Sequence, residues 1–505
     1  MRARMNASIL RVSLFLIIPF TGFSNGDQVR IFLIGDSTMA DKAIIGNPER
    51  GWGMALPLFF SGNVVIENHA RNGRSTKSFI AEGRWAAVSE KLKPGDYVFI
   101  QFGHNDEKKA DTSRFTDPRT DYKANLLRFV NETRSKGAVP VLLTPVARRH
   151  FDKNGEPEFT HGDYPAVVRE LAAEQNVPLI DAEKASMQLL AEYGVEGSKK
   201  LYDWARPELF SAAPGGKKDD THFNSFGAIK IAQLVVAAIK ELNLPLAKFL
   251  QPYDENSAVG LDKTVFLDYF YNNEWRKDAK GRPVRFHYVW EDTTNSGFSL
   301  LGGIISRLGA SIDSLCEAPT AQKLARASVY IIVDPDTPLE TERPNYVEQP
   351  AIDVIADWVK NGGILVLMEN DKGNAEFEHF NQLAAKFGIH FNEDSRNKVT
   401  GNAYDMGKFD TFPDHPLFNG VKQIYMKEIC TLKIEDPAIP LFTDHGDVII
   451  AYASVGKGGV FAVGDPWFYN EYTDHRKLPE AFENDKAAEN LFRWLLQRSA
   501  TVPAN

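Results

Sequence analysis

Cysteine is nearly absent from this sequence, because Cys316 and Cys430 are the only two among 505 residues. Two cysteines do not make a disulfide framework, and neither lies in a metal-binding C-x-x-C motif. An oxidising compartment would allow them to form a disulfide, and two buried free thiols explain them equally well. The sequence therefore excludes a disulfide-stapled scaffold.

Long runs of lysine and arginine are also missing, and the formal net charge at pH 7 is −9. Without a basic stretch to bind phosphates, a nucleic-acid partner is not expected. Tandem repeats and low-complexity tracts are absent too, which excludes solenoids and linker arrays. What is present, 43% hydrophobic and 25% charged residues, is typical of a globular protein.

The apolar stretch near the amino terminus, residues 12–20, is too short to span a bilayer. It follows three arginines and leads into small or turn residues up to Gly26, the pattern of a secretory signal peptide cleaved near Ser24. A core helix is the alternative. We expect residues 1–26 to be a signal peptide, and the mature protein to be periplasmic or extracellular with no membrane span.

The length indicates two domains, since 505 residues exceed what one hydrophobic core usually supports. The proline-containing stretch from Asn243 to Gly260 shows no hydrophobic periodicity and favours a boundary there. We predict a first domain at residues 27–243, a linker at 244–262 and a second domain at 263–500.

Both predicted domains alternate short apolar runs with amphipathic stretches, which indicates βαβ units and parallel sheets, hence an α/β fold class. Strands are predicted in the first domain at Val29–Gly35, Val64–Asn68, Tyr97–Phe102, Val139–Thr144 and Val177–Ile180. Its clearest predicted helices are Tyr122–Arg134, Tyr164–Glu174, Ala182–Tyr193 and Phe226–Leu242. The second domain has strands predicted at Val329–Asp334, Ile364–Met368 and Val460–Gly464, and a helix at Ala351–Lys360.

A candidate nucleophile, Ser37, lies in Gly35-Asp36-Ser37-Thr38 directly after the first predicted strand. Parallel sheets bind ligands at this carboxyl edge, so Ser37 is expected at the right end of the sheet. A turn that caps the next helix is the alternative, and it is the better interpretation of this motif alone. The motif is not Gly-x-Ser-x-Gly, which counts against the nucleophile elbow of the α/β-hydrolase fold.

Two later segments could donate hydrogen bonds to an oxyanion. Asn68–Ser75 follows the second strand and contains Gly73, whose backbone N–H can approach a substrate closely. Gln101–Asp106 ends the third strand and contains Asn105, whose side-chain amide can donate at the same spot. A helix-entry turn and an Asx turn are the alternatives. His104 is interpreted as a structural histidine.

An acid and a base come together in Asp219-Asp220-Thr221-His222, just before the last helix of the first domain. In a turn, a spacing of three can bring the Asp219 carboxylate to one ring nitrogen of His222 while the other nitrogen serves Ser37. Asp220 is the rival acid, more plausibly exposed or a helix cap. A solvated acidic loop would explain the aspartates but not His222.

Together these segments resemble the SGNH hydrolase superfamily, whose blocks are Gly-Asp-Ser, a glycine after the second strand, Gly-x-Asn-Asp and Asp-x-x-His. The blocks Asp36-Ser37-Thr38, Gly103-His104-Asn105-Asp106 and Asp219-Asp220-Thr221-His222 look most like the rhamnogalacturonan acetylesterase branch. The resemblance covers residues 28–243. It implies a flavodoxin-like three-layer fold with a parallel sheet.

The resemblance also implies catalytic roles. Ser37 attacks the ester, His222 serves as base and then acid, and Asp219 orients His222. The N–H groups of Ser37 and Gly73 and the amide of Asn105 form the oxyanion hole. No metal and no organic cofactor is needed.

The substrate implied is an acetylated polysaccharide, and galacturonate-rich pectin is anionic, so a site for it should contain cations. Arg71 and Arg74 flank Gly73, and Arg148 follows the fourth strand at the same sheet edge. Tyr164 could stack on a sugar ring. Solvated surface charge is the alternative for each arginine.

The second domain resembles, more weakly, the class I glutamine amidotransferase-like fold. The nucleophilic cysteine of that family is missing, because the strand ending at Met368 runs into Glu369-Asn370-Asp371. A glycan-binding or structural role is therefore expected.

Two further sets of side chains in the second domain have competing interpretations. Asp371, Glu376 and His379 could bind a metal, but a solvated helix face is the better interpretation because no tight ligand spacing supports a site. Asp465, Trp467 and Tyr469 could line a sugar groove or, for the two aromatic residues, belong to the core.

The sequence thus predicts a secreted serine carbohydrate esterase that removes O-acetyl groups from a plant cell-wall polysaccharide, with rhamnogalacturonan or pectin as the expected substrate, through an acetyl-enzyme. A non-catalytic polysaccharide-binding protein on the same fold is the alternative from another class. An SGNH lipase or thioesterase acting on longer acyl chains is the alternative among enzymes.

Overall fold

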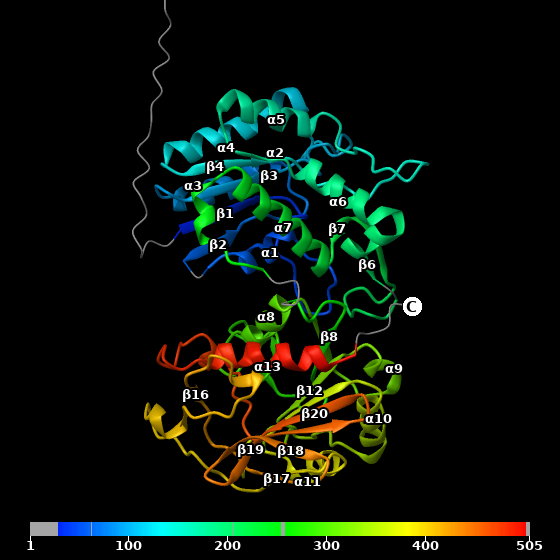
Figure 1. Ribbon diagram of the computed structural model, residues 1–505, viewed down its shortest axis with the longest axis vertical. Coiled ribbons are helices and arrows are strands. Elements are labelled where there is room, and N and C mark those ends of the chain that lie inside the picture. The colour runs from blue at the N-terminus through cyan, green and yellow to red at the C-terminus, as the bar shows by residue number, and fades with distance from the viewer. Residues whose placement is uncertain (1–28, 62, 206, 254–257, 501–505) are drawn as a thin grey trace, which may run out of the picture.

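The computed structural model describes residues 29–61, 63–205, 207–253 and 258–500. The predicted signal peptide at 1–26 lies outside these ranges. Two large sheets organise the described chain, and helices pack on both faces of each (Figure 1). Within these ranges no helix is long and apolar enough to cross a membrane.

The first sheet has five parallel strands in the order β2-β1-β3-β4-β5. This is the flavodoxin-like order, in which ligands bind where the strand order reverses, here between the carboxyl ends of β1 and β3. The prediction of a parallel α/β fold is confirmed. The strands are β1 (Val29–Gly35), β2 (Val64–Asn68), β3 (Tyr97–Gln101), β4 (Val139–Leu143) and β5 (Leu179–Ile180).

Helices cover both faces of this sheet because alternate residues of each strand point to opposite sides. Ile31 and Leu33 of β1 belong to one core with Ile231, whereas Phe32 belongs to the other with Phe129. The first face carries α1 (Trp52–Ala55), α6 (Ala182–Gly197) and α7 (Ser225–Glu241). The second face carries α2 (Thr76–Ala81), α3 (Arg84–Lys91), α4 (Lys123–Ser135) and α5 (Tyr164–Gln175).

A two-stranded hairpin outside the sheet corrects one expectation. The segment with Asp219 and His222, predicted as a loop, belongs to strand β7 (Lys217–Phe223), which pairs antiparallel with β6 (Tyr202–Ala205). The pairing passes from Asp219 opposite Asp203 to Phe223 opposite Tyr202, so the residues between form a bulge. The bulge bends the strand locally and brings positions 219 and 222 together.

The second sheet has nine strands, and its parallel part is flanked by an antiparallel part. The parallel strands are, in spatial order, β11 (Ser311–Leu315), β8 (Thr264–Asp268), β12 (Val329–Val333), β13 (Ile364–Met368) and β20 (Gly458–Val463). The antiparallel strands are β19 (Asp447–Val455), β17 (Leu432–Ile434), β14 (Ile389–Phe391) and β18 (Ala438–Asp444). The prediction of a second α/β unit is confirmed, but the antiparallel extension was not predicted.

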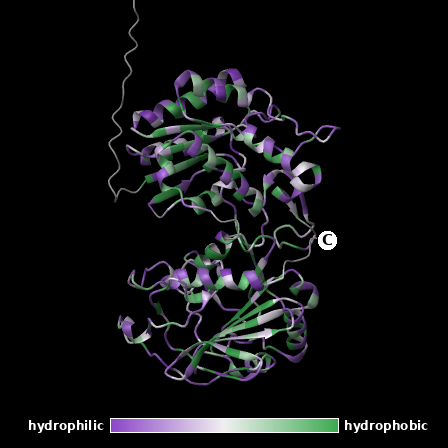
Figure 2. Ribbon diagram, viewed as in Figure 1, coloured by the Kyte–Doolittle hydropathy of each residue, from purple (hydrophilic) through white to green (hydrophobic). Residues whose placement is uncertain are grey.

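Helices also flank the second sheet on both faces, and Figure 2 shows hydrophobic residues along the strands of both sheets. One face packs against α8 (Ser299–Arg307) and α13 (Asn484–Arg498). The other packs against α9 (Ala321–Leu324), α10 (Gln349–Lys360) and α11 (Phe377–Ala385). Smaller elements are the hairpins β9 (Trp275–Lys277) with β10 (Pro283–Arg285) and β15 (Lys408–Phe409) with β16 (Ile424–Tyr425), and helix α12 (Asn470–Thr473).

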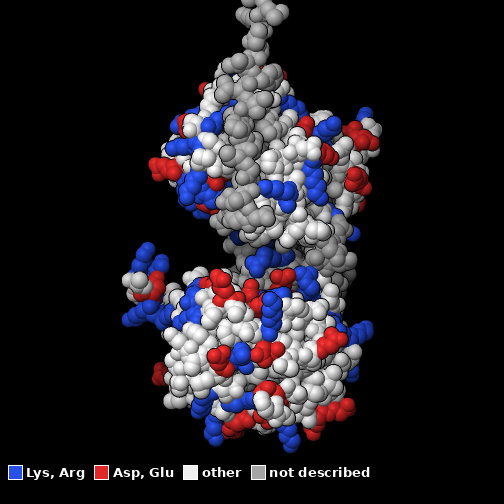
Figure 3. Space-filling view, turned by 60° about the vertical axis from the view of Figure 1, so that its left-hand side comes forward, with Lys and Arg blue, Asp and Glu red and all other residues white. Residues whose placement is uncertain are grey.

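The two parts meet over a narrow junction, where Figure 3 shows the molecule constricted. The Gly46 amide donates to the Ile312 carbonyl at 2.7 Å, next to a parallel bridge between Ile45 and Ile312. Ser211 Oγ donates to Asp313 Oδ1 at 2.8 Å. Strand β11 therefore contacts the loop before α1, which also contributes charged side chains to the site described next.

Both cysteines are free thiols. Cys316 is exposed and Cys430 is buried, so the disulfide that an oxidising compartment would allow is not formed.

Candidate active site

Ser37 lies in a turn at the carboxyl end of β1. Asp36 Oδ1 accepts hydrogen bonds from the Thr38 amide at 2.9 Å and from the Thr38 hydroxyl at 2.8 Å. Gln101, at the end of β3, donates to the same hydroxyl at 2.7 Å. The next helix begins only at Trp52, so this turn does not cap a helix and the helix-cap alternative is wrong.

Ser37, His222 and Asp219 form a continuous hydrogen-bonded chain. His222 Nε2 lies 2.8 Å from Ser37 Oγ, and His222 Nδ1 lies 2.8 Å from Asp219 Oδ2. The other Asp219 oxygen accepts from the amides of Thr221 at 2.8 Å and His222 at 2.9 Å. A hydroxyl, an imidazole and a carboxylate in this order can remove the hydroxyl proton and stabilise the imidazolium that forms.

Asp219 keeps its negative charge. Its partial burial alone would raise the pKa of this carboxyl, but the His222 ring and the amides of His222 and Thr221 together lower that pKa well below its usual range. The carboxylate is therefore ionised wherever His222 can act as a base.

A charged network that the sequence did not reveal supports Asp219. Lys217 Nζ lies 3.9 Å from Asp219 Oδ2, 2.5 Å from Asp203 Oδ2 and 2.7 Å from Glu49 Oε2. Lys42, in the same loop as Glu49, pairs with it at 2.6 Å. Lys217 and Asp219 are two residues apart, so a strand assignment would have put them on one face. Glu49 and Lys42 belong to no sequence motif, so their place beside Asp219 could not be predicted.

The predicted oxyanion donors come from three loops at one sheet edge. Gly73 has φ of 75°, which favours glycine there. Asn105 is buried, and its amide donates to the Arg74 carbonyl at 3.1 Å, which ties its loop to that of Gly73. Within the described chain, the backbone N–H groups of Ser37 and Gly73 have no hydrogen-bond partner, so both are available to a bound oxygen.

Arg114 is a neighbour of this loop pair that the sequence did not single out. Its Nη1 lies 3.5 Å from Asn105 Oδ1, and its Nε donates to Asp111 at 2.5 Å. A Cβ at position 73 would lie 3.5 Å from the same Nη1. The guanidinium therefore orients the Asn105 amide with its oxygen turned toward Arg114 and its nitrogen toward the Gly73 loop.

His104 is buried beside the nucleophile turn. Its Nδ1 lies 3.3 Å from Asp36 Oδ2, and its ring packs edge-on against His161 with centroids 4.4 Å apart. Burial, opposed only in part by Asp36, lowers the pKa of His104 to about 4. The imidazole is neutral at neutral pH, and among the described residues it has no hydrogen bond to Ser37, in agreement with a structural interpretation.

The structure removes Tyr164 from the candidate sugar-binding residues. It is 6% exposed, and its hydroxyl donates to the carbonyls of Asp106 at 3.0 Å and Thr116 at 2.6 Å. Its ring packs against Tyr122 in the core. A side chain held in this way cannot stack on a substrate.

The three predicted arginines differ in their surroundings. Arg74 pairs with Glu82 at 3.0 Å, and Arg148 pairs with Glu107. Arg71 is exposed, and no described residue hydrogen-bonds or ion-pairs with its guanidinium. Only Arg71 of the three has its full charge free for a ligand.

Lys108 is a further free cation, missed because it follows no motif. No described residue pairs with its ammonium, and it lies three positions after Asn105. Partial burial and the positive charges of Arg114 and Arg148 lower the pKa of Lys108. Both arginines are ion-paired, Arg114 with Asp111 and Arg148 with Glu107, so Lys108 is the unpaired cation of the three.

The rival acid, Asp220, is turned away from His222. It accepts from Arg149 Nη1 at 2.9 Å and from Trp204 Nε1 at 2.9 Å. The Asp220 side chain is 45% exposed, as expected, and its carboxylate binds these two partners and caps no helix.

The candidates in the second part have structural partners. Glu376 caps α11 by accepting from the amides of His379 and Phe380, both at 3.1 Å, and Asp371 accepts from Ser395. Trp467 is fully buried, which contradicts the sugar-groove alternative for it. Among the residues that the structure describes, no group of three or more histidine, cysteine, aspartate or glutamate side chains could hold a metal.

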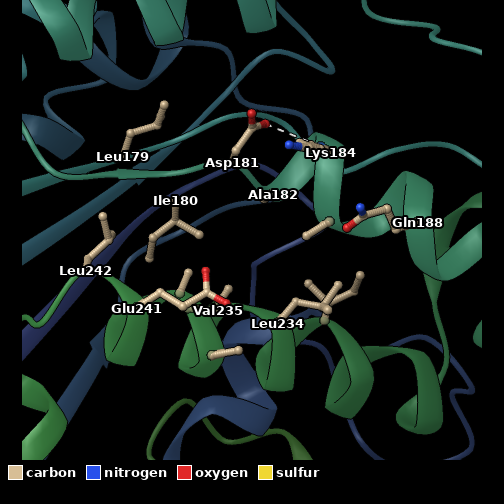
Figure 4. A pocket seen from close by; sticks show the side chains of 14 residues that line it. Leu179, Ile180, Asp181, Ala182, Lys184, Gln188, Leu234, Val235, Glu241 and Leu242 are labelled. Carbon is tan, nitrogen blue, oxygen red and sulfur yellow. Dashed lines mark hydrogen bonds between the residues drawn. The ribbon is translucent and has the colours of Figure 1, made fainter.

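A cavity of about 440 Å³ lies between α6 and α7 beside β5 (Figure 4). Leu179, Ile180 and Leu234 line its apolar part, and Lys184 and Glu241 lie among its polar residues. None of the residues named above for the site lines it.

The first part of the chain is similar to known esterases. The model of the GDSL-like lipase/acylhydrolase family matches residues 33–228. The chain is 43% identical over 222 residues to the rhamnogalacturonan acetylesterase RhgT of Bacillus subtilis, covering 44% of this chain and 94% of RhgT. It is 38% identical over 218 residues to the probable rhamnogalacturonan acetylesterase YesY of the same bacterium, covering 43% of this chain and 95% of YesY. The solved structure of the Bacillus subtilis protein YxiM has 26% identity and a TM-score of 0.37, covering 43% of this chain and 58% of that one.

Proposed function

Because the chain belongs to the GDSL-like lipase/acylhydrolase family and is a carboxylic ester hydrolase acting on carbohydrate, we propose that it removes O-acetyl groups from rhamnogalacturonan or a related pectic polysaccharide. The proposal includes Ser37 as nucleophile and an acetyl-enzyme intermediate. The observation that carries it is the hydrogen-bonded chain of Ser37, His222 and Asp219 at the strand-order reversal.

The reaction proceeds by double displacement. Ser37 Oγ attacks the acetyl carbonyl carbon while His222 Nε2 takes its proton, and the carbonyl oxygen becomes an oxyanion. The tetrahedral intermediate collapses as His222 gives the proton to the departing sugar oxygen, leaving acetate esterified to Ser37. Water, deprotonated by His222, then attacks the acetyl-enzyme, and Ser37 leaves as the hydroxyl and acetate is released.

Three donors stabilise the oxyanion in this scheme: the N–H groups of Ser37 and Gly73 and the amide of Asn105. Two observations support this assignment. The N–H groups of Ser37 and Gly73 have no partner among the described residues, and the Asn105 amide is held by Arg74 and Arg114. Donors that are oriented in advance need no reorganisation when charge develops, which is why they lower the barrier.

Cations beside this centre favour an anionic glycan. Arg71 and Lys108 have no partner within the described chain, and Arg114 and Arg148 lie within electrostatic reach of Lys108. A galacturonate carboxylate would compensate these charges. The preference for a pectic substrate over a neutral one rests on these cations and on the similarity to RhgT and YesY, which are named as rhamnogalacturonan acetylesterases.

The proposal extends to the organisation of the chain. We propose a signal peptide at 1–26 and export to the periplasm or the extracellular space, an esterase domain at 27–243, a linker at 244–262, and a second domain at 263–500. The second domain is proposed as glutamine amidotransferase-like and non-catalytic, because Glu369 follows the strand that would present the cysteine.

The test compares the protein with its Ser37→Ala variant on a chromogenic acetyl ester and on acetylated rhamnogalacturonan and xylan, with acetate release as the readout. We expect Ser37→Ala to reduce release to background. Ser135→Ala, an exposed serine on α4, should leave it unchanged. Equal background release from the parent and Ser37→Ala would contradict the proposal that the protein is an esterase. Faster release from longer acyl esters would contradict the preference for acetyl groups. Faster release from xylan than from rhamnogalacturonan would contradict the pectic substrate.

A further inference from the structure

A second cavity, distant in sequence from the esterase residues, opens in the second part of the chain. Its volume is about 490 Å³, within the range of small-molecule sites. Phe270 and Tyr271, two and three residues after the end of β8, line it, and so do Asn345 and Tyr346 from the segment between β12 and α10. It thus lies beside the carboxyl edge of the parallel strands, where α/β sheets bind ligands.

The walls of this cavity are held in place by hydrogen bonds. Asp268 Oδ1 accepts from the amides of Phe270 at 3.0 Å and Tyr271 at 2.6 Å, which fixes the aromatic pair after β8. Asn345 Nδ2 donates to the Phe270 carbonyl at 2.9 Å and so connects the two walls. Tyr346 stacks on His379 with centroids 4.4 Å apart, which fixes the plane of its ring. The cavity is preformed.

One polar group in the cavity lacks a partner. Tyr271 is 1% exposed, yet no residue in the described ranges hydrogen-bonds to its hydroxyl. The hydroxyl is not one of the fully buried unpartnered atoms, so it is accessible and can donate to or accept from a bound molecule. Thr320 and Glu348 add a hydroxyl and a carboxylate to the same lining.

The lining identifies the chemistry of the ligand. The half-buried rings of Phe270 and Tyr346 suit the C–H face of a sugar ring, and scattered hydroxyl, amide and carboxylate groups suit its hydroxyls. None of the residues that line the cavity is cationic, and one, Glu348, is anionic. An anionic sugar would be repelled here, in contrast to the cation-rich surroundings of Ser37.

We propose that this cavity binds a neutral sugar residue of the polysaccharide that the enzyme deacetylates. The proposal rests on the proposed function for the choice of a glycan. A second contact of this kind keeps the polymer near Ser37 by raising its effective concentration. Small esters gain nothing from it, because they cannot reach both sites.

The experiment uses the full chain carrying Ser37→Ala, so that no ester is hydrolysed. Isothermal titration calorimetry measures binding of two neutral probes, β-1,4-galactotetraose and α-1,5-arabinotetraose, and one anionic probe, tetragalacturonate. We expect a neutral probe to bind and Tyr271→Phe to weaken its binding roughly three- to tenfold through loss of one hydrogen bond. Phe270→Ala should weaken it further. Leu339→Ala, 89% exposed in the same segment and outside the cavity, is the matched control and should bind like its parent.

Three results would overturn the proposal. The first is no binding of either neutral probe at millimolar concentration, and the second is binding that both Tyr271→Phe and Phe270→Ala leave unchanged. The third is tetragalacturonate binding that is equally tight and is lost in the same variants. Chromogenic ester hydrolysis by the chain with Ser37 intact reports on the proposed function alone. In that chain Tyr271→Phe should leave ester hydrolysis unchanged and slow acetate release from dilute polymer. An equal rate on the polymer would contradict the tethering role.

Discussion

Asp219 holds His222 at two points, through Oδ2 to the ring at 2.8 Å and through Oδ1 to the backbone amide at 2.9 Å. The first bond requires the ring proton on Nδ1, which leaves Nε2 free to accept the proton of Ser37. The second fixes the backbone of the bulge in β7, so the acid sets both the tautomer and the position of the base.

Asp219→Asn should separate these two effects. The amide can keep the bulge but favours the wrong ring tautomer, so we expect kcat on a chromogenic acetyl ester to fall roughly 10³- to 10⁴-fold, with little change in the melting temperature. Asp220→Asn is the matched control, because Asp220 contacts Arg149 and Trp204 instead. A similar loss in both variants would contradict the assignment of Asp219 as the orienting acid.

Lys108→Ala should reveal whether the substrate is anionic. Removing this unpaired cation should raise KM for acetylated rhamnogalacturonan several-fold, and more at low than at high ionic strength, because exposed charges are screened by salt. KM for a neutral chromogenic ester should not change. Lys109→Ala, the exposed neighbour, serves as the control. An unchanged KM on the polymer at every salt concentration would mean that Lys108 does not contact a uronate.

Lys217→Met should destabilise the protein by roughly 3 kcal/mol, because it leaves the buried Asp203 carboxylate without its cation. Asp203→Asn in the same chain should recover much of the loss. Lys218→Met, on the opposite face of the strand, is the control. Urea unfolding measures all three, and a double variant no more stable than Lys217→Met would exclude the Asp203 pairing as the cause.

His104 should make stability fall in mild acid. Burial holds the pKa of His104 at about 4 in the folded protein, below the usual value of about 6.5, so the unfolded chain binds an extra proton between these values. The free energy of unfolding should therefore decrease by about 1.4 kcal/mol per pH unit as the pH falls through this range. His104→Gln removes that contribution, so its stability should approach that of the parent between pH 7 and pH 4.5.

Urea unfolding at several pH values checks this prediction. His150→Gln, which replaces an exposed histidine, is the control variant. A constant gap between His104→Gln and the parent would show that the His104 imidazole is protonated in the folded state.

The first sheet could be predicted because parallel strands covered on both faces are continuous apolar runs. Strand β7 could not, since Lys217–Phe223 is mostly polar and pairs outside the sheet. The short antiparallel strands β14 and β17, three residues each, are too brief to show a period. Local sequence therefore predicts the buried parallel strands, whereas the hairpin of β6 and β7 depends on tertiary contacts.

The candidate site likewise contains residues whose positions could be predicted from the sequence and residues whose surroundings could not. Ser37, Gly73 and Asn105 follow strand ends, so the topology alone brings them to one edge. The partners of the arginines could not be predicted, because Glu82 neutralises Arg74 and Glu107 neutralises Arg148 only through the way the loops fold. Tyr164 shows the limit most clearly, since an aromatic residue at a helix start looks the same whether it faces solvent or the core.

The junction between the two parts has an evolutionary consequence. The bond from Gly46 to Ile312 joins backbone atoms, so most substitutions at position 312 would leave it intact. At position 46 this freedom ends, because a Cβ there would lie 1.9 Å from Ser211 Oγ. Position 46 is thus constrained to glycine, whereas position 312 is constrained only by the burial of its side chain in the core. A gene fusion that exchanged the second part for another α/β unit would need to offer an edge strand and one acceptor for Ser211 in place of Asp313.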